Sequence, residues 1–385
     1  MRRHQIRVKF QTEKVIGKAL DDAKSWVNKS SKYSSEQIYK TLLVAGLRKT
    51  SLEDQCLHLQ ERAGGYGSSP SADVVLKVLD QQYGAMDLDT LEQTIAKNLQ
   101  RMAIMLPQFG KKRQSVIIAV DLHDEEYFGK PLYDRDGREI TMYGQLRNKS
   151  GNISGNKRRV FRYATAAIVS FGKRLQIPIT IGFTINYKGQ SRDEVIKKIY
   201  QQILPLNLNI ECMVVDGGFA SIRCFRFLQN QGVSFVSRGN YFKKRIYPVI
   251  GQNFEHTLSG YAGKMTVNAF IVETKSATGN RIRLMYLSSE VITPKVLTDS
   301  YGKHFRIENT YRHAKVVKIR TSTRKVHLRW VFWGISMLLE LLWELIRYLG
   351  KSMGVSDYSF RQKLMIEYFK DHLVLLVPRS IYRFE

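Results

Sequence analysis

The first 110 residues carry the apolar period of amphipathic helices. Capping signals at Ser34-Ser35-Glu36 and Thr50-Ser51-Leu52-Glu53 each precede an apolar-periodic run, and two further runs follow a glycine-rich break: VVLKVLDQ and LDTLEQTIAKNLQRMAIM. We therefore expect a helical domain over residues 1–110. Short helices joined by tight breaks are compatible with a helix-turn-helix DNA-binding module and equally with a plain helical bundle.

After this helical region the chain changes to strands that alternate with helices. Apolar runs rich in valine and isoleucine predict the order strand, strand, strand, helix, strand, helix, strand. In that order the segments are 115–122, 162–171, 175–186, 191–204, 209–216, 220–232 and 232–238. This order predicts an α/β sheet whose first three strands form an antiparallel meander, and it matches an RNase H-like fold.

Residues 239–298 show a third pattern, of alternating apolar positions without a strong helical period. The runs RIYPVI, MTVNAFIVET and RIRLMYLSS predict strands joined by turns, so we expect a β-rich insertion here. The insertion would divide the α/β core into a first part, 111–238, and a second part, 299–350. Residues 351–385 are expected to form a helical tail.

The most apolar segment of the chain, residues 328–350, has two interpretations. Its length suits a membrane span, but Glu340 and Glu344 lie inside it, one helical turn apart. Two carboxylates in mid-span would be costly in lipid, so we expect a mostly buried helix and no membrane partner.

The net charge of the chain indicates what kind of partner it binds. A hydrophobic fraction of 43% is ordinary for a globular protein, whereas a net charge of +27 is not and indicates a nucleic-acid partner. The three scattered cysteines, Cys56, Cys212 and Cys224, form no pair motif and no even framework, so we expect neither zinc nor disulfides. The first residues lack the apolar core of a signal peptide, and we expect a cytoplasmic protein.

Three carboxylates on separate predicted elements point to a metal centre. Asp121 and Asp216 each follow an apolar strand, and Glu308 lies in a predicted helix among aromatic and basic residues. In an RNase H-like sheet the first two would be neighbours, with Glu308 packed across the sheet. Carboxylate oxygens are ligands that Mg²⁺ prefers, and two such ions suit phosphodiester cleavage. Asp124 is the alternative to Asp121.

Basic residues surround each of the three carboxylates in the sequence. Stretches without any acidic residue run over 140–192 and 309–339, and a further basic run follows Asp216. We expect these stretches to track DNA phosphates, with binding that weakens steeply with salt. They include Arg158, Arg159, Arg238, Arg312, Lys315, Arg320 and Arg324.

The segment YGKHFRIENTYRHAK at 301–315 resembles the signature of DDE transposases of prokaryotic insertion sequences, in the group with a tyrosine–arginine–glutamate–lysine pattern around the last acid. Tyr301, Glu308 and Lys315 fall in register with that pattern, while His304 occupies the arginine position. The DGGFAS segment is similar to the family's second-aspartate motif, with Gly217 in place of an arginine. The stretch KIRTSTRKVHLRW is similar to archaeal members.

This resemblance implies cut-and-paste DNA transposition. Asp121, Asp216 and Glu308 would be the catalytic residues and would bind two Mg²⁺ ions, with Mn²⁺ as a substitute. Tyr301 and Lys315 would hold phosphates near the cut, and His304, or Arg306 or Arg312, would replace the signature arginine. The implied partners are terminal inverted repeats, target DNA and a second copy of the chain on paired ends, in a prokaryotic nucleoid.

Two other functions remain open from the sequence. A metal-dependent nuclease with the same fold would cut DNA without strand transfer. A DNA-binding protein derived from a transposase would not cut at all, although the complete carboxylate triad argues against that.

Overall fold

The computed structural model describes residues 26–62, 69–105, 115–147, 153–171, 178–240, 250–275, 279–291 and 293–352. The chain divides into two compact units. The first unit contains Met1–Phe109, Leu132–Arg138 and Asn309–Glu385, and the second contains Gly110–Pro131 and Glu139–Glu308. The predicted helical tail falls almost wholly outside the described residues. The domain boundaries expected from the sequence stay a prediction.

The second unit is built on a mixed sheet with the predicted RNase H-like core. Strand order in this core is β4-β3-β1-β5-β6, with β1–β3 and β3–β4 antiparallel and β1–β5 and β5–β6 parallel. The bounds are β1 Ser115–Glu126, β3 Ile153–Phe171, β4 Ile179–Asn186, β5 Asn209–Val215 and β6 Phe235–Gly239. The antiparallel meander followed by parallel strands confirms the predicted fold class.

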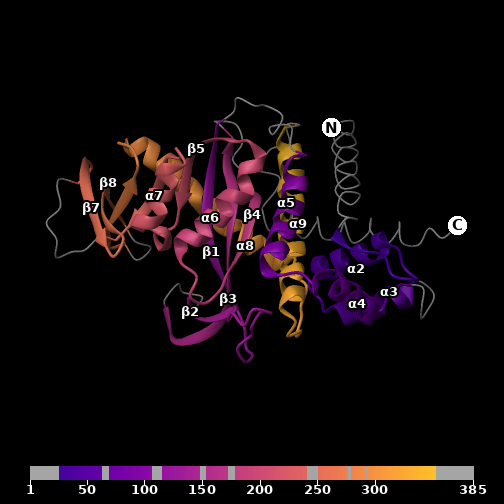
Figure 1. The fold of residues 1–385 in the computed structure, drawn as a ribbon. Helices are drawn as coiled ribbons and strands as arrows, with labels where there is room; N and C mark the ends of the chain where they lie inside the picture. Colours follow the sequence, from indigo (N-terminus) through magenta and orange to yellow (C-terminus); the bar gives the residue numbers. More distant parts are fainter. Residues whose placement is uncertain are drawn as a thin grey trace. The chain divides into compact units, whose positions relative to one another are not determined.

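Two helices connect the later strands of this core. Helix α6, Arg192–Ile203, begins with a capping box formed by Ser191 and Glu194, as the serine signal predicts. It packs against β4 and β3 and against helix α7, Ile222–Asn230 (Figure 1). Strands covered by helices are buried, which explains why all 8 residues of β4 are buried, its threonines and asparagine included.

The sheet extends further than the apolar pattern predicts. Strand β3 begins at Ile153 rather than 162, and β2, Thr141–Arg147, pairs with its first half without having been predicted. Strand β1 likewise continues beyond Asp121 to Glu126, which pairs with Val160. These segments are polar, and backbone pairing with a neighbour extends them as strands without an apolar period.

The β-rich insertion joins the same sheet. Its strands are β7 Asn253–Gly260, β8 Gly263–Lys275 and β9 Arg281–Ser288, and β9 pairs antiparallel with β6. Strand β7 was not predicted, and all but the last residue of the predicted strand RIYPVI lies outside the described residues. The insertion is therefore a continuation of the core sheet rather than a separate layer.

The first unit contains the four helices predicted near the N-terminus. They are α2 Ser35–Arg48, α3 Leu52–Arg62, α4 Ala72–Tyr83 and α5 Leu88–Ala103. Ser34 forms a capping box with Gln37, and Ser71 and Asp87 cap α4 and α5. Polar side chains that satisfy the first backbone amides thus set the starts of these helices.

The long apolar helix of the first unit, α9 Val326–Ser352, packs against α2, α4 and α5 (Figure 1). Gly334 lets it approach α5, because a Cβ there would lie 3.2 Å from Ile95 Cγ2. A helix that is apolar on all sides is one that is buried on all sides. Within the described ranges, no helix is long and apolar enough to cross a membrane.

Candidate active site

Asp121 and Asp216 occupy matching positions beside neighbouring parallel strands. Val120 of β1 is in register with Val215 of β5, and an aspartate is the next residue in both cases. The backbone amide of Asp216 donates to the carbonyl of Val120 at 3.4 Å. The two carboxylates therefore lie at the same level of the sheet, as expected from the sequence, although Asp121 is inside β1 rather than at its end.

Asp121 is deeply buried, with 8% of its surface exposed. Its Oδ1 accepts a hydrogen bond from the Leu122 amide at 2.7 Å. Burial raises the pKa of Asp121 to about 8, and the charge of Asp216 contributes to this rise, with smaller contributions from Glu308 and Asp124. Asp121 therefore lies within electrostatic range of both other predicted metal ligands.

Glu308 lies on helix α8, Pro294–Val316. The segment before it packs on the sheet: Ile307 is buried, and Arg306 Nη1 donates to the carbonyl of Val169 in β3 at 2.7 Å. Glu308 itself is exposed. Helix packing thus holds the backbone of this segment against the sheet and leaves its carboxylate accessible.

The three carboxylates do not form one tight set of ligand atoms among the described residues. Around a single ion, three ligand atoms would have to lie close together, and the described residues whose ligand atoms lie within 4.8 Å of one another do not include this triad. Two divalent ions in phosphodiester-cleaving sites lie about 4 Å apart, and carboxylate oxygens are the ligands that Mg²⁺ prefers. Cations would also offset the burial and the carboxylate repulsion that together raise the pKa of Asp121.

Asp124, the alternative ligand, is already held by an arginine. Arg162 lies directly opposite it on β3, and its Nε and Nη2 donate to the two carboxylate oxygens at 2.5 and 2.6 Å. Such a bidentate pair fixes both oxygens of the carboxylate. The structure therefore favours Asp121 over Asp124 as a ligand.

We expect Asp124→Asn and Asp121→Asn to separate the two roles. Asp124→Asn loses a half-buried ion pair and should lower the free energy of unfolding by about 1–2 kcal/mol, with DNA cleavage within about tenfold of the parent. Asp121→Asn should reduce cleavage by more than about a hundredfold. Replacing a residue that only hydrogen-bonds to a metal ligand already lowers metal affinity or activity by about 10–100-fold. Cleavage rates and urea denaturation measure both effects. A greater loss of cleavage in Asp124→Asn would reverse the assignment.

Two aromatic rings of the transposase-like signature lie beneath the surface within electrostatic range of Asp216. Tyr301 is 6% exposed and His304 3%, and their rings stack at 5.4 Å between centroids. Burial raises the pKa of Tyr301, and the charge of Asp216 adds to this effect. Burial lowers the pKa of His304, which favours a neutral imidazole, although Asp216 opposes it. Their contacts with DNA stay predictions.

Gly217 follows Asp216 where the backbone comes close to β6. A Cβ on Gly217 would lie 3.0 Å from the carbonyl oxygen of Arg238, so a larger residue would require β6 to shift. Arg238 is exposed on β6. The backbone and Cβ of an arginine, Arg238, therefore lie beside the position from which the signature arginine is missing.

Arg192, which sequence reasoning missed, is a further cation of this site. It is the first residue of α6 and donates from Nη1 to Asn186 Oδ1. Burial lowers its pKa, and Arg162 adds to this, while the charges of Asp124 and Asp216 oppose them. The sequence marks this position only as the first after a helix cap, so no local signal indicates its role.

The other predicted DNA-binding residues are distributed over both units. On β3, Arg158 pairs with Glu126 at 3.2 Å, and Arg159 contacts Glu139 at 3.5 Å. The first unit holds the remaining predicted DNA-binding residues, which all have exposed side chains: Arg312, Lys315, Arg320 and Arg324. Their roles in DNA binding stay predictions.

The sequence of the chain matches a known protein family. A family model described as the transposase DDE domain covers residues 127–339, more than half of the 385-residue chain. The chain belongs to this transposase family. The matched segment includes Asp216 and Glu308 and begins six residues after Asp121.

The fold is similar to that of a solved transposase. A cryo-EM structure of a piggyBac transposase synaptic complex with hairpin DNA aligns over 92% of this chain and 74% of that chain, with a TM-score of 0.53 and 12% sequence identity. At this identity the likeness concerns the fold alone. No curated protein matches the chain by sequence.

Proposed function

We propose that the chain is a cut-and-paste DNA transposase of a prokaryotic insertion sequence, with Asp121, Asp216 and Glu308 as its catalytic carboxylates. The observation that carries the proposal is the position of Asp121 and Asp216 at one level of neighbouring parallel strands, with Glu308 close enough to raise the pKa of Asp121. Membership of the transposase DDE domain family supports the same reaction class.

The donor set fits two Mg²⁺ ions, for which Mn²⁺ would substitute. Asp121, Asp216 and Glu308 supply only carboxylate oxygens, and the buried Asp121, which the other two repel, gains most from a cation. When bound, such ions activate water and neutralise charge at the departing oxygen. The protein residues would hold them from rigid strands and one packed helix.

Basic residues around the carboxylates would hold the DNA. Arg238 lies on β6 beside Gly217, and Arg192 lies within electrostatic range of Asp216. Both would bind phosphates on either side of the scissile bond, with Lys315 further along α8. Neutralising several phosphates makes affinity fall steeply with salt.

The DNA partners would be the terminal inverted repeats and a target. The N-terminal helices α2 to α5 would supply base recognition, and a homodimer would pair the two ends. The similar piggyBac structure is a synaptic complex with hairpin DNA, which supports a paired-end assembly. A prokaryotic cytoplasm with nucleoid DNA is the setting in which such an enzyme would act.

A cleavage assay on labelled terminal-repeat DNA tests this function. With Mg²⁺ the full chain should nick the repeat at the element end, and EDTA should abolish cutting. Adding a supercoiled target plasmid should yield joined products. Cleavage without joining would instead show a metal-dependent nuclease, and binding without cleavage would show an inactive DNA-binding protein.

A further inference from the structure

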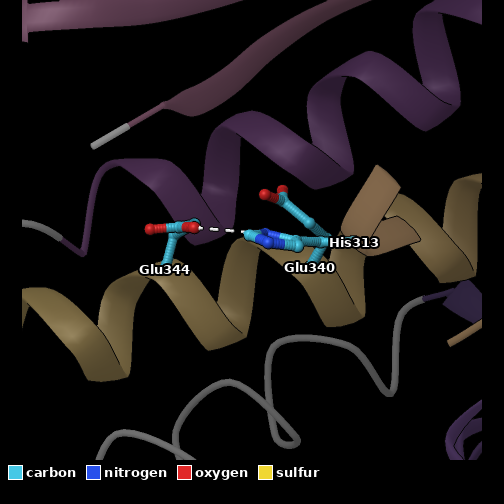
Figure 2. Close-up of side chains that lie close together, drawn as sticks. All are labelled: His313, Glu340 and Glu344. Carbon is cyan, nitrogen blue, oxygen red and sulfur yellow. Dashed lines mark ion pairs between the residues drawn. The ribbon is translucent and has the colours of Figure 1, made fainter. Parts of the chain in front are cut away.

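A second group of possible metal ligands lies in the first unit and contains none of the proposed catalytic carboxylates. His313 lies on α8, and Glu340 and Glu344 lie one turn apart on α9. One ligand atom from each lies within 4.8 Å of the others. Figure 2 shows both glutamates extending from α9 and the imidazole facing the Glu344 carboxylate, at 3.6 Å from Nδ1 to Oε1.

The three side chains are buried, and two of them, His313 and Glu340, have possible ligand atoms without a hydrogen bond. Glu340 and Glu344 are 0% exposed and His313 is 7% exposed. Neither oxygen of Glu340 makes a hydrogen bond, nor does Nδ1 of His313. The Thr310 hydroxyl lies near Glu340, but the two groups do not meet in the geometry of a hydrogen bond. Buried polar atoms are nearly always bonded, so these unbonded atoms are candidate ligand atoms.

The charges in the cluster are only partly balanced. Arg347 Nη1 donates to both oxygens of Glu344 at 2.7 and 2.8 Å. No comparable cation contacts Glu340 among the described residues, and burial, followed by the charge of Glu344, raises its pKa well above the ordinary value. Glu340 is therefore a carboxylate whose burial in the charged form is costly.

We propose that His313, Glu340 and Glu344 bind one Zn²⁺ ion that joins α8 to α9. Zinc takes nitrogen and carboxylate ligands at about 2.0–2.2 Å in tetrahedral sites, so neighbouring ligand atoms lie about 3.4 Å apart. The His313–Glu344 distance of 3.6 Å is already close to that value. Imidazole disfavours Mg²⁺, which prefers oxygen ligands and bound water.

Zinc here would have a structural role. A carboxylate has room for more than one partner, so Glu344 can bind both Arg347 and a metal ion. The ion would supply the interaction that Glu340 and His313 lack. Because the cluster is buried, the ion would bind as the protein folds. His313 lies five residues after Glu308 in the same helix, so the ion would anchor the end of the helix that carries this residue.

Metal content of the purified full chain tests the proposal. The starting protein for this test, called the parent below, should carry Asp216→Asn and Glu308→Gln. With these changes the proposed catalytic carboxylates do not contribute to the measured zinc content. After dialysis against Zn²⁺ and gel filtration, the parent should retain about one equivalent, and Co²⁺ should give visible absorption bands of a low-symmetry site. His313→Ala/Glu340→Gln should lose that equivalent and those bands.

A matched histidine variant controls for nonspecific loss. His327, which lies 2.8 Å from Asp80 in the same unit, is outside the cluster, so His327→Ala should retain the zinc. A parent that retains no zinc, or a His313→Ala/Glu340→Gln variant that retains as much as the parent, would overturn the proposal. A protonated Glu340 would then be the state of the cluster.

Thermal unfolding gives a second readout. Zinc at about 100 times its dissociation constant should raise the Tm of the parent by roughly 5 °C relative to EDTA. His313→Ala should show no such rise. The loss of cleavage in Glu308→Gln is independent of this result, so the two proposals can fail separately.

Discussion

Glu308→Gln should reduce Mg²⁺-dependent DNA cleavage by about a hundredfold to a thousandfold. Glutamine keeps the size of the side chain but removes the negative charge, and loss of one charge-stabilising group in a preorganised site costs about 10²–10³-fold or more. Because Glu308 is exposed on a packed helix, its replacement should leave the fold intact. Single-turnover cleavage of terminal-repeat DNA measures the rate, and gel shift measures binding, which should change less than about threefold.

An exposed acid of the same unit provides the matched control. Glu255 lies on β7, so Glu255→Gln makes the same loss of charge in the insertion and should retain parental cleavage. If Glu308→Gln kept more than a tenth of the parental rate, the carboxylate assignment would be wrong. Equal losses in both variants would point to an effect of overall charge.

Leu339→Ala should lower the free energy of unfolding of the first unit by about 3 kcal/mol. Leu339 is 0% exposed on α9, and its Cδ1 fills the space above Gly46 of α2, where a Cβ would lie 2.9 Å away. Removing a fully buried leucine side chain costs about 2–5 kcal/mol through lost apolar burial and the resulting cavity. Urea denaturation followed by tryptophan fluorescence measures the change.

The close contact between α2 and α9 gives a double-mutant test. Gly46→Ala alone should destabilise by about 1–3 kcal/mol, because the added methyl group would lie 2.9 Å from Leu339 Cδ1 and 3.0 Å from the carbonyl oxygen of Val317. In Gly46→Ala/Leu339→Ala the methyl group fills part of the cavity, so the combined loss should be smaller than the sum of the two single losses. Leu57→Ala, at a half-exposed position, should change stability by less than about 0.5 kcal/mol. Full additivity would show that α2 and α9 do not pack as described.

Local signals in the sequence predicted the helices and the apolar strands well. Ser34, Ser51 and Ser191 stand where helices begin, because a serine side chain satisfies the first backbone amides wherever the helix lies. Strand β2 had no comparable signal. Its pairing with β3 is a long-range interaction that leaves no apolar period in its sequence.

In the candidate site, too, the sequence indicated some residues and only the folded structure revealed the others. The residue types and the strand-ending pattern indicated Asp121 and Asp216, and the helical signature indicated Glu308. The physical reason to prefer Asp121 over Asp124 came from the arginine opposite Asp124 on β3, a strand whose register the sequence does not state. Arg192 remained hidden because its relation to Asp216 depends on how α6 packs against the sheet.

The sequence by itself determined the capped helices and the apolar strands of the core, the RNase H-like class and the chemical character of a basic protein with three candidate carboxylates. Only the tertiary structure decided which charged groups meet. In the structure Arg162 forms an ion pair with Asp124. His313 lies close to Glu340 and Glu344, which come 27 and 31 residues later in the chain. Caps and apolar periods act over a few residues, whereas strand register and helix packing depend on contacts between distant segments.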